Sequence, residues 1–444
     1  MVGHQLTVRN FGPIRDAEVD INRFLLLIGP QSSGKSTIAK LIYYFLHVRD
    51  ETISFVYDSV NSETGLRFPI DLQKILTRRF IEFWGTTTQD QEVYIKYVYK
   101  NDIYIEISLD KKDHQFVTIY LSPGLKQKID ELIKKIPPND SKQNSESFFP
   151  STSGKIAYEQ ERKILVEEIR ITCNQIFNYE KNLFYIPAGR SLPSILAEQL
   201  QWIPPHLLDY PMKQFMETVN ITKTVFTKSI DDLVVERRVL TSEKLDYPHI
   251  RKAQAYIKKI LKGEYKYDKE GGKLFIEGKG FTKINFASSG QQEVVWILLS
   301  LFLLVLDRVQ TLVFIEEPEA HLFSEAQKDI VEFIVFVFNT VECDFVITTH
   351  SPYLVSCLNN LLYSHELQNR IDKKSIDSII PREIHLDPQN ITGYFMLGGG
   401  IESLASEEEP HFLKCENLDL ASEQINNDFE NLLTLEREVA RIER

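Results

Sequence analysis

A glycine-rich segment, GPQSSGKST, carries the most specific chemistry in the sequence. It spans residues 29–37 and matches the pattern G-x-x-x-x-G-K-[ST], in which successive backbone N–H groups surround phosphate oxygens. In this pattern Lys35 reaches the β- and γ-phosphates of a nucleotide, and the Ser36 hydroxyl binds Mg²⁺. The residues predicted to contact the nucleotide are Gly29, Pro30, Gln31, Ser32, Ser33, Gly34, Lys35, Ser36 and Thr37.

The segments on either side of this loop favour the same interpretation. Residues 24–28, FLLLI, form an unbroken apolar run, which is typical of a strand buried on both faces of a sheet. The segment after the loop places Ile38, Leu41, Ile42 and Phe45 on one face of a helix. A strand, a loop and a helix in this order direct the positive end of the helix toward the phosphates. A glycine-serine turn with a solvated lysine is the alternative, but it would not require these flanks.

A second apolar strand is predicted at residues 311–315, and it ends in Glu316 and Glu317. We expect Glu316 to hold Mg²⁺ through its waters, and Glu317 to orient or deprotonate the attacking water. Aspartate is the usual residue in the first role, so Glu316 is a departure whose longer side chain must be accommodated. The alternative is a solvated acidic turn after an edge strand, but this strand is too apolar to be an edge.

A third apolar strand stops at His350. Its imidazole can form a hydrogen bond with a γ-phosphate oxygen or with the attacking water. A lone histidine that caps a strand is more often structural, but the position of His350 after the Glu-Glu strand favours function. Lys35, Glu317 and His350 are therefore the predicted catalytic residues, and Ser36 and Glu316 the predicted metal site.

Ser289, Gly290 and Gln291 precede the apolar helix that begins near Val294. Serine and glycine before a helix form a second anion-binding N-terminus. One chain has little use for two phosphate cradles per nucleotide, whereas two chains that face each other head to tail can each offer the second cradle to the other. The sequence therefore predicts a homodimer or higher homo-oligomer in which these three residues contact the nucleotide of the partner.

Four motifs in this order resemble those of a known family. GPQSSGKS, SSGQQ, LVFIEEPEAHL and ITTHSP look like the Walker A, signature, Walker B with D-loop, and H-loop motifs of ABC-type ATPases related to SMC and RecF proteins. Within that group the chain is most similar to AAA family ATPases of prokaryotic anti-phage systems, such as the OLD nucleases, the PtuA subunit of Septu and the AriA subunit of PARIS. The resemblance extends from Leu6 to about Phe395 and includes LTVRNFGPI and YIPAGR.

This resemblance implies an ATPase with ATP and Mg²⁺ as cofactors, in which Ser289 and Gly290 bind the γ-phosphate of the partner's ATP. The signature departs from the common LSGGQ at Ser288 and Gln291. No glutamine equivalent to a Q-loop can be placed, and Arg190 is expected near the site. The resemblance also places three residues at the D-loop between subunits: Glu319, His321 and Ser324.

The predicted fold is α/β, an ABC-ATPase head with a mixed, largely parallel core sheet, an antiparallel β meander and a helical lobe. Its parts are the head at 1–400, its core at about 1–50, 180–204 and 263–400, the inserted meander and helices at about 51–179, the helical lobe at about 205–262, and an acidic helical tail at 401–444. Residues 137–155 are rich in proline, serine and asparagine and predict a linker or disordered loop.

Composition and charge limit the possible partners. The net charge of −12 argues against a surface that binds nucleic acid everywhere, although a local basic groove remains open. Residues 401–444 contain 12 acidic and 4 basic residues, which suits a solvated helix face or a docking surface for a basic partner. The four cysteines have no paired spacing, which indicates a reducing cytoplasm and no zinc site. The apolar run at 294–306 is too short to span a bilayer and predicts a buried helix, and the N-terminus lacks a signal-peptide core.

The resemblance also bears on the biological role. OLD nucleases resemble this chain as far as the histidine loop and then continue into a Toprim domain, for which the sequence after His350 is too short and too poor in acidic strands. We therefore expect the ATPase and sensor subunit of an anti-phage defence complex, acting on a separately encoded effector, a nuclease, with DNA as a possible partner and no membrane. The alternatives are a RecF/SMC-like DNA repair or maintenance ATPase and, disfavoured by EEPEAHL in place of a motif like DEPTSALD, a transporter subunit.

Overall fold

The computed structural model describes residues 3–61, 66–85, 92–109, 117–136, 152–195, 207–240, 245–276, 278–406, 412–414, 427–430 and 432. Most of the predicted linker and most of the predicted acidic tail lie outside the described residues. The described strands form one six-stranded, one five-stranded and one three-stranded sheet.

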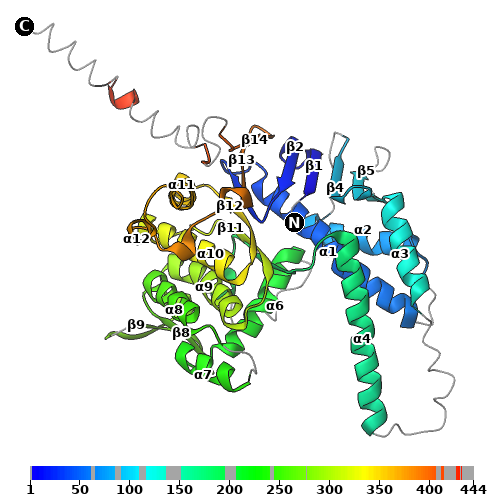
Figure 1. Ribbon diagram of the computed structural model, residues 1–444, viewed down its shortest axis with the longest axis horizontal. Helices are drawn as coiled ribbons and strands as arrows, with labels where there is room; N and C mark the ends of the chain where they lie inside the picture. The colour runs from blue at the N-terminus through cyan, green and yellow to red at the C-terminus, as the bar shows by residue number, and fades with distance from the viewer. Residues whose placement is uncertain are drawn as a thin grey trace, which may run out of the picture.

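The elements follow one another along the chain with helices and strands interspersed (Figure 1). The strands are β1 (His4–Phe11), β2 (Ile14–Ile21), β3 (Phe24–Ile28), β4 (Tyr94–Lys100), β5 (Ile103–Leu109), β6 (Val117–Leu121), β7 (Asn182–Ile186), β8 (Glu264–Asp268), β9 (Gly271–Ile276), β10 (Gly280–Lys283), β11 (Thr311–Glu316), β12 (Asp344–Thr349), β13 (Ile391–Leu397) and β14 (Gly400–Ser403). The helices are α1 (Lys35–Asn61), α2 (Ile70–Trp84), α3 (Pro123–Lys135), α4 (Thr152–Phe177), α5 (Leu192–Ile195), α6 (Tyr210–Val225), α7 (Ile230–Leu240), α8 (Tyr247–Leu261), α9 (Ser289–Asp307), α10 (Ser324–Val341), α11 (Pro352–Leu367) and α12 (Lys373–Asp377).

The six-stranded sheet, in the order β14-β13-β3-β12-β11-β7, forms the centre of the molecule. Its strands from β13 to β7 are parallel, and β14 at the edge is antiparallel. Every residue of β3, β11 and β12 is buried, which explains why these strands are continuous apolar runs and not alternating ones. Because parallel strands end at the same edge, Ile28, Glu316 and Thr349 finish within one residue of the same level.

Apolar side chains cover both faces of this central sheet. On one face, Leu25, Leu27 and Phe314 pack with α1 and with the five-stranded sheet. On the other face, Phe24 and Leu26 pack with α8, α9, α10 and α11. Figure 1 shows where these helices lie relative to β11 and β12. Successive residues of β3 therefore enter opposite apolar layers, as the two-residue period of a strand requires.

Helix α9 is the apolar helix predicted from residues 294–306. Its length and composition would allow it to cross a membrane. Its side chains instead pack inside the second apolar layer, where Trp296, Leu298 and Phe302 are buried. The prediction of a buried helix is confirmed.

The predicted meander is present as β4, β5 and β6, and it belongs to the antiparallel sheet β2-β1-β4-β5-β6. The N-terminal hairpin of β1 and β2 is expected in the core sheet. It joins the antiparallel sheet instead, because β1 pairs with β4, with Leu6 opposite Tyr97. The predicted hairpin around Gly271 is also present, between β8 and β9. The predicted α/β fold class, with a largely parallel core sheet, an antiparallel meander and a helical lobe, is confirmed.

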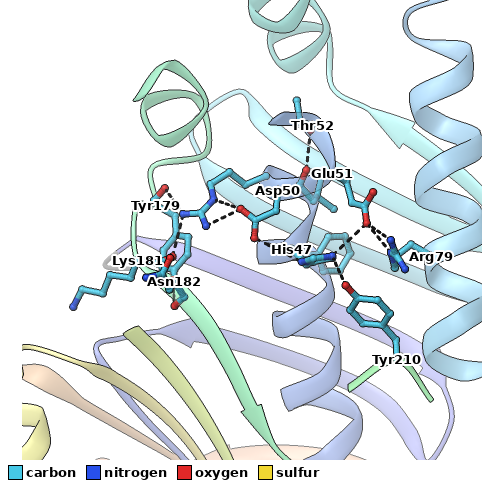
Figure 2. A network of polar contacts seen from close by, with 12 residues as sticks. His47, Asp50, Glu51, Thr52, Arg79, Tyr179, Lys181, Asn182 and Tyr210 are labelled. Carbon is cyan, nitrogen blue, oxygen red and sulfur yellow. Dashed lines mark hydrogen bonds and ion pairs between the residues drawn. The ribbon is translucent and has the colours of Figure 1, made fainter. Parts of the chain in front are cut away.

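A polar network fixes the second half of α1 to its neighbours (Figure 2). His47 Nε2 lies 2.8 Å from the Tyr210 hydroxyl and 3.2 Å from Glu51, and its Nδ1 lies 3.7 Å from Asp50. Arg79 of α2 forms an ion pair with Glu51 at 2.6 Å. Burial alone would lower the pKa of His47, but the hydrogen bonds to Asp50 and Glu51 outweigh it and raise this pKa above 6.5. The network therefore joins α1 to α2 and to the start of α6.

We expect His47→Gln to destabilise the protein more at about pH 6 than at about pH 9. A histidine with a raised pKa contributes its full stabilisation below the pKa of the unfolded chain, and this contribution is lost as the pH rises through the raised pKa of the folded state. Denaturant unfolding of wild type and variant at the two pH values measures the difference. An equal difference at both pH values would show that protonated His47 does not stabilise the fold.

Candidate functional site

The predicted phosphate loop connects β3 to the N-terminus of α1. Ser32 and Gly34 have positive φ angles of 59° and 103°, the kind of backbone from which anion-binding nests are built. A Cβ atom on Gly34 would lie 2.7 Å from Ile14 Cγ1, and one on Gly29 would lie 2.3 Å from the carbonyl oxygen of Met396. Both positions therefore need glycine, because β2 and β13 pack directly against the loop.

Lys35 extends its amine into this loop. Its Nζ donates to the carbonyl oxygens of Gly29, at 2.9 Å, and Pro30, at 2.8 Å, and lies 3.3 Å from Nδ1 of His350. Burial lowers the pKa of Lys35 from 10.5 to about 8, although the charge of Glu317 acts in the opposite direction. Phosphate oxygens would give this buried ammonium group charged acceptors, which form stronger hydrogen bonds than neutral carbonyls.

Glu317 and His350 form a hydrogen-bonded pair beside Lys35. Glu317 Oε1 lies 2.8 Å from Nε2 of His350. Because an ammonium group can only donate, Nδ1 of His350 accepts from Lys35, and the ring proton lies on Nε2 toward Glu317. The side chains of Glu317 and His350 are 33% and 28% exposed. The structure thus brings the three predicted catalytic residues into one row of contacts, in which Lys35 is buried and Glu317 and His350 are partly exposed.

Glu316, predicted to hold Mg²⁺, is the last residue of β11 and is buried. Its Oε1 accepts a hydrogen bond of 2.6 Å from the Tyr185 hydroxyl, and its Oε2 accepts one of 3.0 Å from the Ala188 N–H. Each carboxylate oxygen has two acceptor positions, so both can still accept from another donor. The neighbouring strand β7 therefore accommodates and orients the longer glutamate side chain. The sequence does not predict the contacts of Tyr185 and Ala188 with Glu316, although both residues belong to the motif YIPAGR.

Glu319, predicted at the subunit interface, is buried inside the chain. Its Oε1 accepts from the Thr349 hydroxyl at 2.5 Å and from the His350 N–H at 2.9 Å, so it holds the end of β12 and with it the histidine. Arg190, expected near the site, is wholly buried and donates to the backbone carbonyls of Glu316 and Glu317. The role of Glu319 in this structure is therefore to position His350.

The segment predicted as a second phosphate cradle forms the N-terminus of α9. Ser288 caps the helix, and its hydroxyl accepts from the Gln291 N–H. The Gln291 side chain completes this capping box and donates to the carbonyl of Leu261 at 2.9 Å, so it is engaged within the chain. Ser289 is exposed, and a Cβ atom on Gly290 would lie 2.6 Å from the carbonyl oxygen of His321. The start of α9 and the D-loop are therefore packed against each other.

The residues of the loop fit a nucleoside triphosphate with Mg²⁺. Ser33 Oγ is buried without a hydrogen-bond partner in the described part of the chain, and the first N–H groups of α1 have no acceptor within the helix. Both kinds of donor suit phosphate oxygens. Ser36 and Glu316 would hold the Mg²⁺, which supplies positive charge to the phosphate oxygens when it is bound. Glu317 would take a proton from the attacking water, and His350 would hold Glu317 in place.

Comparison with known proteins identifies the family of the chain. Residues 1–355 match the family model described as "AAA ATPase domain". Two solved structures have some similarity to the chain. They are the SMC head domain from Thermotoga maritima, at a TM-score of 0.35, and the SMC head bound to the C-terminal winged-helix domain of ScpA, at 0.39. Each is 12% identical and covers 91% of this chain and 98% of its own. No curated protein sequence matches the chain.

The buried parallel sheet and the phosphate loop at its edge define a P-loop ATPase. The family match covers most of the chain, including the loop, the two glutamates and His350. The chain belongs to the AAA ATPase domain family. It is an ATPase, which binds and hydrolyses ATP.

We expect Glu317→Gln to keep its affinity for ATP and to lower kcat by at least about 100-fold, because the amide retains the shape of the side chain but cannot accept the proton. Phosphate release gives kcat, and calorimetry with a slowly hydrolysed ATP analogue gives Kd. Glu383→Gln, which alters an ion pair with Lys252 outside the site, is the matched control and should change neither value. If Glu316→Gln kept binding and lost only turnover, the two roles assigned to Glu316 and Glu317 would be exchanged.

Proposed function

We propose that the protein hydrolyses ATP at composite sites in a head-to-tail homodimer or higher homo-oligomer. The observation that carries this proposal is the exposure of Ser289 at the N-terminus of α9, the end at which a helix carries partial positive charge and suits an anion. Phe286, just before this segment, and Phe323, beside the adjoining D-loop, are each 77% exposed. Exposed aromatic side chains around an anion-binding helix end suit a surface that a second copy covers.

In such a site one chain supplies the loop residues together with Glu317 and His350, and its partner supplies the start of α9. Ser289 and Gly290 of the partner would bind the γ-phosphate. Both the side chain and the backbone N–H of Gln291 are used in the helix cap, so the proposal depends on Ser289 and Gly290. The ATP would then join the two chains, and hydrolysis would separate them.

The head-to-tail arrangement predicts that two inactive variants restore activity when they are mixed. Ser289→Arg blocks the cradle that a chain offers to its partner, and Lys35→Ala removes the charge from its own phosphate loop. In a mixed dimer one site combines the intact loop of the first chain with the intact cradle of the second. ATP hydrolysis measured over a range of mixing ratios should therefore recover to a maximum of about half the wild-type rate in the mixed dimers.

Ser356→Arg is the matched control for this mixing experiment, because Ser356 is also exposed but lies on α11. The Ser356→Arg variant on its own should hydrolyse ATP at the wild-type rate. No recovery at any ratio, from two folded variants that form mixed dimers, would show that Ser289 does not act on the partner's ATP.

We further propose that this ATPase is the sensor and regulator of a separately encoded effector, a nuclease, in a cytoplasmic anti-phage defence complex. The sequence resemblance to ATPases of such systems supports this role. The segments inserted between β3 and β7 add surface suited to another protein, and the excess of acidic residues in the sequence of 401–444 suits a basic partner. A phage-derived signal would change the geometry of the ATP-bound dimer and thereby release or activate the effector.

Co-purification with the product of the adjacent gene tests this role. We expect a complex that forms with the ATP-bound Glu317→Gln chain, and nucleic-acid cleavage only by the partner or by the complex. Strong metal-dependent cleavage by this chain alone would contradict the proposal. A chain without an adjacent partner whose ATP hydrolysis is stimulated by DNA would instead support a repair or maintenance ATPase.

A further inference from the structure

Arg190 is the most completely buried charged side chain near the ATP site. It lies in the turn after β7, and its exposed fraction is 0%. Its guanidinium donates to four backbone carbonyl oxygens. The acceptors are those of Glu316 at 2.6 Å, Glu317 at 2.6 Å, Glu293 at 3.1 Å and Pro187 at 3.3 Å. The two shortest of these bonds hold the backbone at the end of β11.

The backbone held by Arg190 is the one that directs the catalytic carboxylate. Glu317 has a φ angle of 46°, in the left-handed region that residues other than glycine rarely adopt. A strained residue of this kind persists only where its surroundings fix it. Arg190 fixes it from one side, and the hydrogen bond of 2.8 Å from the Glu317 N–H to the Thr348 carbonyl fixes it from the other.

Arg190 also reaches the helix that begins with the second phosphate cradle. Its Nε lies 3.4 Å from the carboxylate of Glu293, which is buried on α9 four residues after Ser289 and so lies one turn along the helix. A second bridge runs beside this pair, because the Ser194 hydroxyl donates to the Gln292 carbonyl and accepts from the Trp296 indole. The turn after β7 is therefore bonded both to α9 and to the end of β11.

Stability alone is a poor explanation for this arrangement. Burial in an apolar environment disfavours a charged guanidinium and lowers the pKa of Arg190. The pair with Glu293 is long, and Glu293 Oε2 has no hydrogen-bond partner within the described residues. Replacing a buried ion pair that has such a long separation by apolar side chains often leaves the stability of a protein unchanged or raises it. The shortest hydrogen bonds of Arg190 are those to the carbonyls of Glu316 and Glu317. This arrangement suggests that Arg190 maintains the geometry of the ATP site.

We propose that Arg190 is a positioning residue for ATP hydrolysis, which, with Glu293, holds the Glu317 backbone in register with the start of α9. The inference rests on the proposed function, in which Glu317 is the base and α9 serves the partner's ATP. It assigns Arg190 no contact with the nucleotide. Arg190 acts on the proton-transfer step through the Glu317 backbone, and the rate of that step is sensitive to small displacements.

Arg49 is a matched control, because it is a buried arginine of the same chemistry at a different place. It is 5% exposed, donates to the carbonyls of Tyr179 and Lys181 at 3.3 and 3.1 Å, and pairs with Asp50 at 2.8 Å. It stands 14 residues after Lys35 on α1, about 21 Å along the helix axis. Figure 2 shows the network that surrounds it, with Tyr179, Lys181 and Asp50 labelled.

The first test compares Arg190→Lys with Arg49→Lys. A lysine keeps the charge, but its single nitrogen cannot replace three guanidinium nitrogens that bind separate carbonyls. Both variants should lower Tm. Only Arg190→Lys should lower kcat, by about tenfold or more, while its KM and its Kd for an ATP analogue stay within about twofold of wild type. Equal losses of kcat in both variants, or none in Arg190→Lys, would overturn the proposal.

The second test repeats Arg190→Lys in a chain that already carries Glu317→Gln. If Arg190 acts through Glu317, the added substitution should lower the residual kcat by less than about twofold, whereas independent effects would multiply. Glu293→Gln should resemble Arg190→Lys with a smaller loss of kcat. If the double variant lost kcat by the product of the two single losses, the positioning role of Arg190 would be refuted, but the proposed function would not. Normal turnover by the single Glu317→Gln variant would instead refute the proposed function on which it rests.

Discussion

The ATP site depends on the parallel register of the strands β3, β12 and β11, which is fixed because both faces of the central sheet are buried. Neighbouring strands lie about 4.8 Å apart, and all of them end at one edge. The phosphate loop, His350 and Glu317 follow these three strand ends directly. A slip of one residue in any strand would exchange its two buried faces and would also move its functional side chain away from the others. The packing that stabilises the sheet is thus the same packing that assembles the site.

Much of this arrangement could be predicted from the sequence, because the features concerned are local. An unbroken apolar strand has few alternatives, and each of the three core strands is followed at once by a chemically distinctive residue. Lys35, Glu317 and His350 lie close together because each follows the end of a core strand, and these three strands are neighbours in the sheet. The buried helix after Ser289 was equally clear from its composition.

Other parts could not be predicted, because they depend on contacts between distant segments. Nothing near Tyr185 indicates that its hydroxyl holds Glu316, and nothing near Glu319 indicates that it holds His350. The pairing of β1 with β4 likewise joins segments about 90 residues apart. The capping role of Gln291 is different, since serine followed three residues later by glutamine is a capping-box pattern. This signal is local, so the cap, unlike the contacts above, can be predicted from the sequence.

Four glutamates lie near this edge of the sheet. Three of them hold neighbouring groups in place, and one is placed to react. Glu293, Glu316 and Glu319 are only 5 to 7% exposed, and each has a donor or cation of the same chain beside it. The side chain of Glu317 is 33% exposed, and its Oε1 lies 2.8 Å from the ring Nε2 of His350, which carries an exchangeable proton. A general base must meet water and release its proton, which a carboxylate enclosed by fixed donors does poorly. Of these four glutamates, Glu317 is the one with a left-handed backbone, so backbone strain and exposure fall on the same residue, as they often do at a functional site.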